Sequence, residues 1–268
     1  MGERRWNKPI ASLLATTVLA AQMLGGVFNV PVLAAGKAEA SPVINPGTIN
    51  LRLMSTTDVH TNVYGWDYFK GAASATVGLD RTSTLVKAAR NDPDGKYNLL
   101  LDNGDLIQGT PLGTYMAQVS DFKTSEDQIH PIIAAMNLMG YDAATFGNHE
   151  FNYGLDYLDR TVKGNVSSAT YKESTGAKFP YVNANIYNKS DGKKNTFEPY
   201  QIIDKVVKDS NGNTVTIRVG LMGLVTPQIM EWDKVNLEKK TLLPKILWKR
   251  RRSLFLKCRT MVRTLSSP

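Results

Sequence analysis

The sequence predicts an α/β fold, and two observations carry this prediction. Short apolar segments with strand character alternate along the chain with segments whose apolar residues recur at helical spacing. Three of the expected strands also end directly in turns that carry Asp, His or Asn side chains. In open α/β sheets, ligand sites form outside the carboxyl ends of the strands. We therefore expect the three polar turns to converge on one rim of a sheet.

The expected elements follow one another from Ile49 onward. Strands are expected where apolar residues alternate or form short runs, and helices where they recur every three or four residues. A Ser-Asn-Gly-Asn run at 210–213 predicts a hairpin turn. The expected strands are 49–54, 97–101, 143–146, 182–186 and 218–224, and the expected helices are 79–89, 129–139 and 154–161.

The first 35 residues predict a secretory signal peptide. Basic residues at Arg4 and Arg5 precede an apolar run over 10–32, and small residues then offer a peptidase site. The run is long enough to span a bilayer, so a membrane anchor is the alternative, but its Gly and Asn residues favour cleavage. Residues 36–48 are expected to form a spacer. We expect a secreted protein, either extracellular, associated with the cell wall or periplasmic, which meets a membrane only during export.

The net charge of +8 is confined to the end of the chain. Residues 239–268 hold ten Lys and Arg and no Asp or Glu, which leaves 22 basic and 24 acidic side chains elsewhere. The body is therefore near neutral, and no nucleic-acid partner is expected apart from nonspecific binding by the basic tail. The sole cysteine, Cys258, lies in that tail, so no internal disulfide is expected.

The polar turns offer oxygen and nitrogen ligands for divalent cations. Asp58 and His60 are expected on the same side of an extended segment, because side chains of a strand alternate with a period of two. Gly104 permits a sharp turn at Asp105, whose carboxylate can bridge two ions. Asn148 supplies an amide oxygen, a hard donor suited to a second ion. This mixed ligand set favours Zn, Mn or Fe-type ions.

Two such ions about 3.5–4 Å apart clamp a phosphate and activate a water molecule. His149 is then placed to stabilise negative charge on the phosphate or to protonate the leaving oxygen. Each motif alone has a simpler explanation: Asp-x-His as a hydrogen-bonded loop, Gly-Asp as a turn, and Asn148 as a helix cap. Their joint occurrence at three strand ends favours the metal site. His130, which precedes Pro131 at a helix start, is expected to be structural or to lie on the surface.

The three turns resemble the D-x-H, G-D and G-N-H-[ED] blocks of the calcineurin-like metallophosphoesterases. The residues around 101–110 and 145–154 are similar to the branch of 5′-nucleotidases and 2′,3′-cyclic-nucleotide 2′-phosphodiesterase/3′-nucleotidases. The resemblance implies a layered α/β/β/α sandwich with mixed sheets, incomplete at the C-terminus. It places a partial catalytic domain over 49–238 and leaves the basic tail, 239–268, without family resemblance.

The resemblance also implies roles for individual residues. His149 would be the catalytic histidine, and Asn152 would stand where 5′-nucleotidases typically have an Asp that orients it. The Phe-Asn-Tyr-Gly sequence that includes Asn152 resembles the cyclic-nucleotide subgroup. It implies hydrolysis of 2′,3′-cyclic nucleotides and 3′-nucleotides with two divalent ions. The implied metal ligands are Asp58, His60, Asp105 and Asn148.

The sequence departs from the family pattern after residue 238. Family members carry later histidine blocks, A-H-S-G and G-H-x-H, whereas this sequence has no histidine after His149. The second metal site is therefore expected to be incomplete, and the alternatives are a 5′-nucleotidase or an inactive fragment that holds at most one ion. We hypothesise that the tail from about Lys239 is an out-of-frame translation. A genuine basic tail that binds nucleic acid or anionic lipid is the other explanation.

Overall fold

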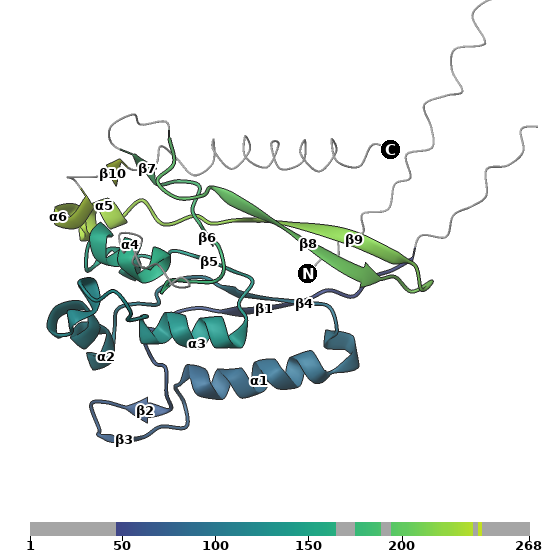
Figure 1. Cartoon of the computed structure of the whole chain (residues 1–268), viewed down its shortest axis with the longest axis horizontal. Helices are drawn as coiled ribbons and strands as arrows, with labels where there is room; N and C mark the ends of the chain where they lie inside the picture. The colour runs from purple at the N-terminus through teal and green to yellow at the C-terminus, as the bar shows by residue number, and fades with distance from the viewer. Residues whose placement is uncertain (1–46, 165–174, 189–193, 238–240, 243–268) are drawn as a thin grey trace, which may run out of the picture. The chain divides into compact units, whose positions relative to one another are not determined.

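A parallel sheet lies at the centre of the part of the chain that the computed structural model describes, residues 47–164, 175–188, 194–237 and 241–242 (Figure 1). The predicted signal peptide and spacer lie outside these residues, except for Gly47 and Thr48. Each neighbouring pair of strands in this sheet runs parallel. In spatial order the strands are β1 (Arg52–Thr56), β4 (Asn98–Asp102), β5 (Ala143–Thr145) and β6 (Tyr181–Val182).

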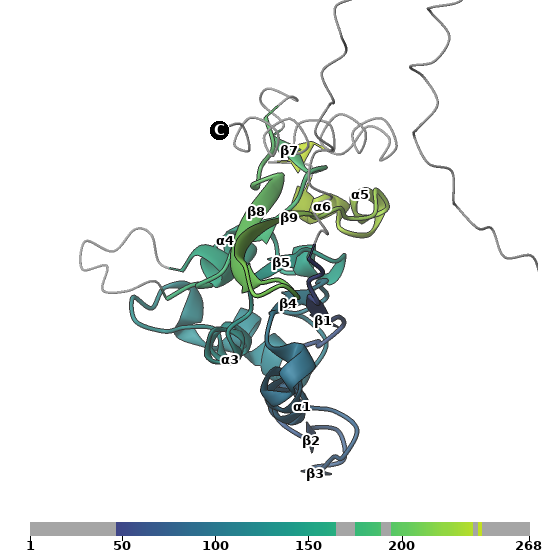
Figure 2. The same cartoon turned by 90° about the vertical axis from the view of Figure 1, so that its right-hand side faces the viewer.

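Helices cover one face of this sheet. The views in Figures 1 and 2 both place α1 (Leu79–Asn91) and α3 (Pro131–Met139) on the same side of β4 and β5. Side chains from both helices and from β4 are buried in one apolar cluster, which includes Val86, Leu100 and Ile133. Helix α3 ends at Gly140, whose φ of 66° is the left-handed conformation that favours glycine.

A long hairpin lies on the opposite side of the sheet (Figures 1 and 2). Its strands β8 (Tyr200–Lys208) and β9 (Thr214–Met222) pair antiparallel over their full lengths. The chain leaves β9 through Gly223, where a Cβ atom would lie 2.0 Å from Oγ1 of Thr145 and 2.1 Å from the Val182 carbonyl oxygen. Only glycine therefore lets the end of the hairpin approach the parallel sheet this closely.

Shorter elements complete the described residues. No helix among them is long and apolar enough to cross a membrane. The short helices include 3₁₀ turns, and Tyr115–Val119 forms a π-helical turn. These elements are β2 (Trp66–Asp67), β3 (Ala72–Ala73), η1 (Pro93–Gly95), α2 (Pro111–Thr114), η2 (Tyr115–Val119), η3 (Asp121–Lys123), η4 (His149–Phe151), α4 (Leu155–Lys163), β7 (Tyr187–Asn188), α5 (Ile229–Trp232), α6 (Lys234–Leu237) and β10 (Thr241–Leu242).

The α/β class is confirmed, with parallel and antiparallel pairing present in separate sheets. The strand expected at 182–186 is wrong beyond Val182, because the following residues turn away to hydrogen bond with the segment after β9. The pattern also missed β8. Of the basic tail, only β10 is described, and it pairs antiparallel with β7. The domain boundary at 238 stays a prediction.

His130 is structural, as expected. It is fully buried at the N-cap of α3, and its Nδ1 accepts the Ile132 amide at 3.3 Å. Since Nδ1 is an acceptor, the neutral ring carries its proton on Nε2 and donates it to the Tyr157 hydroxyl at 3.0 Å. Burial lowers the pKa of His130 to about 3, so the ring stays neutral in the folded protein.

A His130→Asn variant, which keeps a good N-cap residue, tests this burial. An unfolded chain protonates His130 near pH 6.5 and the folded chain only near pH 3, so the wild type loses stability as the pH falls between these values. We expect the variant to lose about 1 kcal/mol less per pH unit between pH 6 and 4.5. Urea unfolding at several pH values measures this, and equal pH dependence in both proteins would contradict it.

Candidate metal centre

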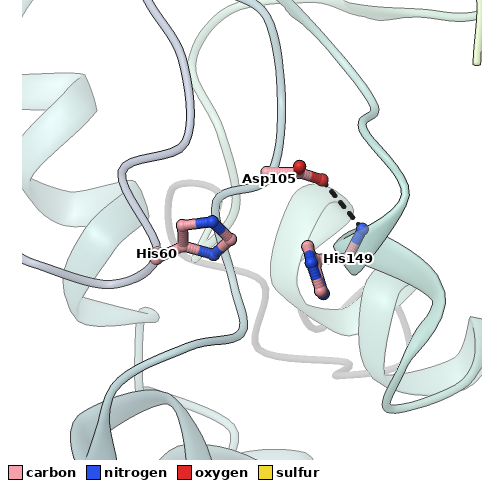
Figure 3. A group of neighbouring side chains, drawn as sticks. All are labelled: His60, Asp105 and His149. Carbon is pink, nitrogen blue, oxygen red and sulfur yellow. Dashed lines mark hydrogen bonds between the residues drawn. The ribbon is translucent and has the colours of Figure 1, made fainter.

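Three predicted site residues meet at the carboxyl ends of the parallel strands. His60 follows β1, Asp105 follows β4, and His149 follows β5. One ligand atom from each lies within 4.8 Å of the others (Figure 3). The rings of His60 and His149 meet edge to face, with centroids 5.1 Å apart. The convergence on one rim that the sequence predicted is therefore present in the fold.

The backbone of these loops adopts an unusual conformation. Among the described non-glycine residues, positive φ angles occur at Asp58 (54°), His60 (49°), Thr61 (56°) and Asp105 (58°). The expectation that Asp58 and His60 share one side of an extended segment is wrong, because β1 ends at Thr56 and both residues are left-handed. Such residues cost about 1–3 kcal/mol each and cluster at functional sites.

Hydrogen bonds between the first two loops maintain this conformation. The amides of Asp58, His60 and Thr61 donate to the carbonyls of Gly104, Asp105 and Leu106, at 3.0, 3.0 and 2.8 Å. The pairing of β1 with β4 thus continues past the strand ends, with the left-handed residues inside it. This pairing brings His60 and Asp105 side by side.

The tautomer of His60 follows from its hydrogen bond. Its Nδ1 lies 2.6 Å from the Gln108 carbonyl oxygen, which can only accept, so Nδ1 carries the proton. In the neutral ring Nε2 then presents its lone pair, which is the arrangement found in metal-binding histidines. A Cβ atom at Gly109 would lie 2.7 Å from the Cβ of His60, so glycine is needed beside the ring.

Asp58 lies at the edge of the cluster. Its Oδ1 is 3.8 Å from Nε2 of His60, and its side chain is 58% exposed. Two donors about 2.1 Å from one ion lie at most about 4.2 Å apart, so Asp58 and His60 fit a shared ion. Oδ2 of Asp58 accepts the Thr57 hydroxyl at 2.5 Å. Asp58 does not belong to the group of His60, Asp105 and His149 whose ligand atoms lie within 4.8 Å of one another. The role of Asp58 as a metal ligand stays a prediction.

The turn that presents Asp105 depends on its neighbours. Gly104 has a φ of 92°, and a Cβ atom there would lie 2.0 Å from the Gly147 nitrogen. The buried carboxylate of Asp102 accepts the Thr56 hydroxyl at 2.6 Å and the Gly104 amide at 2.9 Å. Burial raises the pKa of Asp102 to about 7. These contacts confirm that Gly104 permits close approach of two loops and a sharp turn.

Glu150 holds the second and third loops together, a role that the sequence reasoning missed. The side chain is 1% exposed. Its Oε2 accepts the amides of Asp105 and Gly147, at 2.9 and 2.6 Å, and its Oε1 accepts the amide of Leu106 at 2.5 Å. Burial raises the pKa of Glu150. The sequence feature that could have indicated this role is the position of Glu150 in the Gly-Asn-His-Glu motif. That motif does not reveal which backbone amides the carboxylate accepts.

His149 is fixed through both its backbone and its ring. Its amide donates to Oδ1 of Asp105 at 2.8 Å (Figure 3). Its Nδ1 lies 2.7 Å from Oδ1 of Asn152, the residue predicted to orient it. Asn148 begins η4 without a side-chain capping bond, which contradicts its explanation as a helix cap and leaves its amide oxygen for other partners. Ligation by Asn148 stays a prediction.

A Gly147→Ala variant tests the spacing of the loops. The added Cβ would lie 2.2 Å from Oδ1 of Asp105 and 2.6 Å from the Asp105 nitrogen, so Asp105 must move. We expect Mn²⁺ to bind at least about tenfold more weakly, measured by isothermal titration calorimetry. Gly220→Ala is the matched control, because its Cβ would meet nothing within 4 Å. Equal Mn²⁺ affinity in both variants would contradict the prediction.

A Glu150→Gln variant tests the buried carboxylate. Glutamine offers one carbonyl oxygen and turns an NH₂ group toward at least one backbone amide. We expect the free energy of unfolding in urea to fall by about 3 kcal/mol, because a charge-assisted hydrogen bond is lost and a buried donor is left unpaired. The exposed Glu231→Gln change should stay within about 0.5 kcal/mol of the wild type. A Glu150→Gln variant as stable as this control would contradict the role of the carboxylate.

Known proteins are similar to this chain in sequence and in fold. The chain is 46% identical over 197 residues to a 2′,3′-cyclic-nucleotide 2′-phosphodiesterase/3′-nucleotidase of Salmonella typhimurium, which covers 74% of this chain and 28% of that protein. It is 29% identical over 216 residues to a 5′-nucleotidase of Vibrio cholerae, which covers 80% of this chain and 31% of that protein. The chain thus spans less than a third of either relative.

A solved structure extends the similarity to the fold. The calcineurin-like phosphoesterase YfkN of Bacillus subtilis superposes with a TM-score of 0.68 at 41% identity, over 79% of this chain and 58% of that chain. The family model for calcineurin-like phosphoesterases matches residues 51–260 of the chain. The matched region therefore extends past the predicted domain boundary at residue 238. The chain belongs to the calcineurin-like phosphoesterase family.

Proposed function

We propose that this chain carries the metal-binding part of a nucleotide phosphoesterase, which hydrolyses 2′,3′-cyclic nucleotides and 3′-nucleotides in preference to 5′-nucleotides. The convergence of His60, Asp105 and His149 within 4.8 Å is the observation that carries the proposal. Imidazole and carboxylate groups that face one another at this spacing suit divalent transition-metal ions. The names of the related proteins support nucleotides as the substrate class.

The donor set fits a metal, because Nε2 of His60 is left with its lone pair and the carboxylate of Asp105 lies beside it. We propose that Asp58 and His60 would hold one ion and that Asp105 would serve as a ligand to both ions. Asn148 would begin a second, incomplete site. Bound divalent ions supply Lewis acidity toward the phosphate and lower the pKa of water. Zn²⁺ and Mn²⁺ both suit these ligands.

His149 supplies the protein's own contribution to the reaction. Its Nδ1 is engaged by Asn152, so Nε2 is the nitrogen available to a substrate. We propose that His149 acts in its doubly protonated form, in which Nδ1–H is held by Asn152 and the proton on Nε2 is donated to a phosphate oxygen or to the leaving oxygen of the nucleoside. This role requires the ring to hold one orientation while phosphate charge develops.

Two observations support the preference for cyclic and 3′-nucleotides. The chain has Asn152 where the 5′-nucleotidase pattern has Asp, and Asn152 contacts the ring of His149 directly. The identity to the cyclic-nucleotide phosphodiesterase is 46%, against 29% for the 5′-nucleotidase. The basic, apolar N-terminal sequence further supports a location outside the cytoplasm.

A second candidate is a chain that holds one ion and hydrolyses nothing. It is favoured by the donor set, because the candidate metal-ligand group among the described residues consists of His60, Asp105 and His149. Weak occupancy of a single ion follows from such a reduced donor set.

Hydrolysis of bis-p-nitrophenyl phosphate with added Mn²⁺ or Zn²⁺ separates the two candidates. We expect turnover by the wild type and a loss of about a hundredfold in kcat/KM, or about 3 kcal/mol, for Asp105→Asn. Exposed Asp94→Asn is the matched control and should retain wild-type kcat/KM. Folded, metal-loaded protein without turnover would favour the inactive chain. Among 2′,3′-cyclic AMP, 3′-AMP and 5′-AMP, the highest kcat/KM with 5′-AMP would overturn the substrate preference.

A further inference from the structure

Asp233 has an environment that the fold alone does not explain. It lies between α5 and α6, and only 5% of it is exposed. Its Oδ1 accepts one hydrogen bond, from Nδ2 of Asn152 at 2.9 Å, while the buried Oδ2 has no hydrogen-bond partner among the described residues. Burial of a carboxylate with so few donors is costly, so a contact with a functional group would account for its presence.

The hydrogen bond of Asp233 decides how the amide of Asn152 is turned. A carboxylate can only accept, so it takes the NH₂ group of Asn152 and turns the amide oxygen toward His149. That oxygen lies 2.7 Å from Nδ1 of His149 and can likewise only accept. Nδ1 must therefore carry the proton. The orientation of Asn152 and the tautomer of His149 both follow from Asp233.

We propose that Asp233 is the remote positioning residue for His149 and acts through the amide of Asn152. The proposal rests on the phosphoesterase function proposed above. Asp233 and Asn152 together orient His149, and the carboxylate is linked to the imidazole by two successive hydrogen bonds through the Asn152 amide. Without the carboxylate, the amide of Asn152 can rotate and present its NH₂ group to Nδ1, which moves the ring proton to Nε2.

The neighbouring Asn236 distinguishes this role from structural support. Its Nδ2 donates to the carbonyl oxygens of Phe151 and Asn152, at 3.0 Å each. Asn236, which lies on α6, thus holds the backbone of the same turn but makes no contact with the Asn152 amide group among the described contacts. Replacing the Asn236 side chain therefore tests support of the backbone at residues 151–152. Replacing the Asp233 carboxylate tests the tautomer of His149.

The tautomer of His149 can be observed directly. The sequence has three histidines, so long-range ¹H–¹⁵N correlation spectra of the ¹⁵N-histidine-labelled full chain are readily resolved by comparison with His→Gln variants. We expect the Nδ1–H form of His149 in the wild type and in Asn236→Ala, and a mixture or the Nε2–H form in Asp233→Asn. The Nδ1–H form alone in Asp233→Asn would overturn the proposal, whether or not the chain turns over substrate.

Steady-state kinetics, and a double variant that exchanges the carboxylate and the amide between positions 152 and 233, complete the test. We expect Asp233→Asn to lower kcat about tenfold with KM changed less than about twofold, and exposed Glu231→Gln to leave both unchanged. Asn152→Asp alone places two carboxylates in contact and should lose at least as much. The double variant Asn152→Asp/Asp233→Asn restores donor and acceptor order, so it should recover the Nδ1–H tautomer and kcat to within about threefold of wild type. A double variant no better than the single changes would overturn the proposal.

Discussion

A single buried carboxylate, that of Glu150, joins the loops on which the candidate site depends. It accepts three backbone amides from two loops, and one of them belongs to Asp105 itself. Burial of a charge is costly, and here three backbone donors offset part of that cost, although burial still raises the pKa of Glu150. The strained left-handed backbone at Asp105 is therefore held by contacts on both sides, from Glu150 and from the loop that carries His60. These hydrogen bonds hold the backbone that presents the site residues.

The fold positions the site in two steps, first by placing the loops and then by orienting their side chains. The parallel sheet brings the carboxyl ends of β1, β4 and β5 to one rim, which places the loops close together. Hydrogen bonds then set the individual side chains. The Gln108 carbonyl fixes which nitrogen of His60 is free, and the Asn152 amide does the same for His149. Both rings thus have their Nδ1 engaged, so that Nε2 is the free nitrogen of each.

The sequence predicted the parts of this site that depend on local order. Strand and helix periodicity located the four strands of the parallel sheet, β9 and the three longest helices, and the polar turns after three strands located His60, Asp105 and His149. The left-handed loop at Asp58 was missed because it depends on pairing with residues more than 40 positions away. The contacts of Glu150 with Leu106 and of Asn152 with Asp233 span 44 and 81 residues, so no local pattern encodes them. Family resemblance supplied residue roles that periodicity alone could not.

The separation of 81 residues between Asn152 and Asp233 divides the centre along the chain. His60, Asp105 and Glu150, with the hydrogen bonds that hold their loops, all lie at or before residue 150. The carboxylate that turns the Asn152 amide toward His149 comes only after the β8–β9 hairpin. The groups that could hold an ion and the group that orients His149 are therefore encoded in separate parts of the chain.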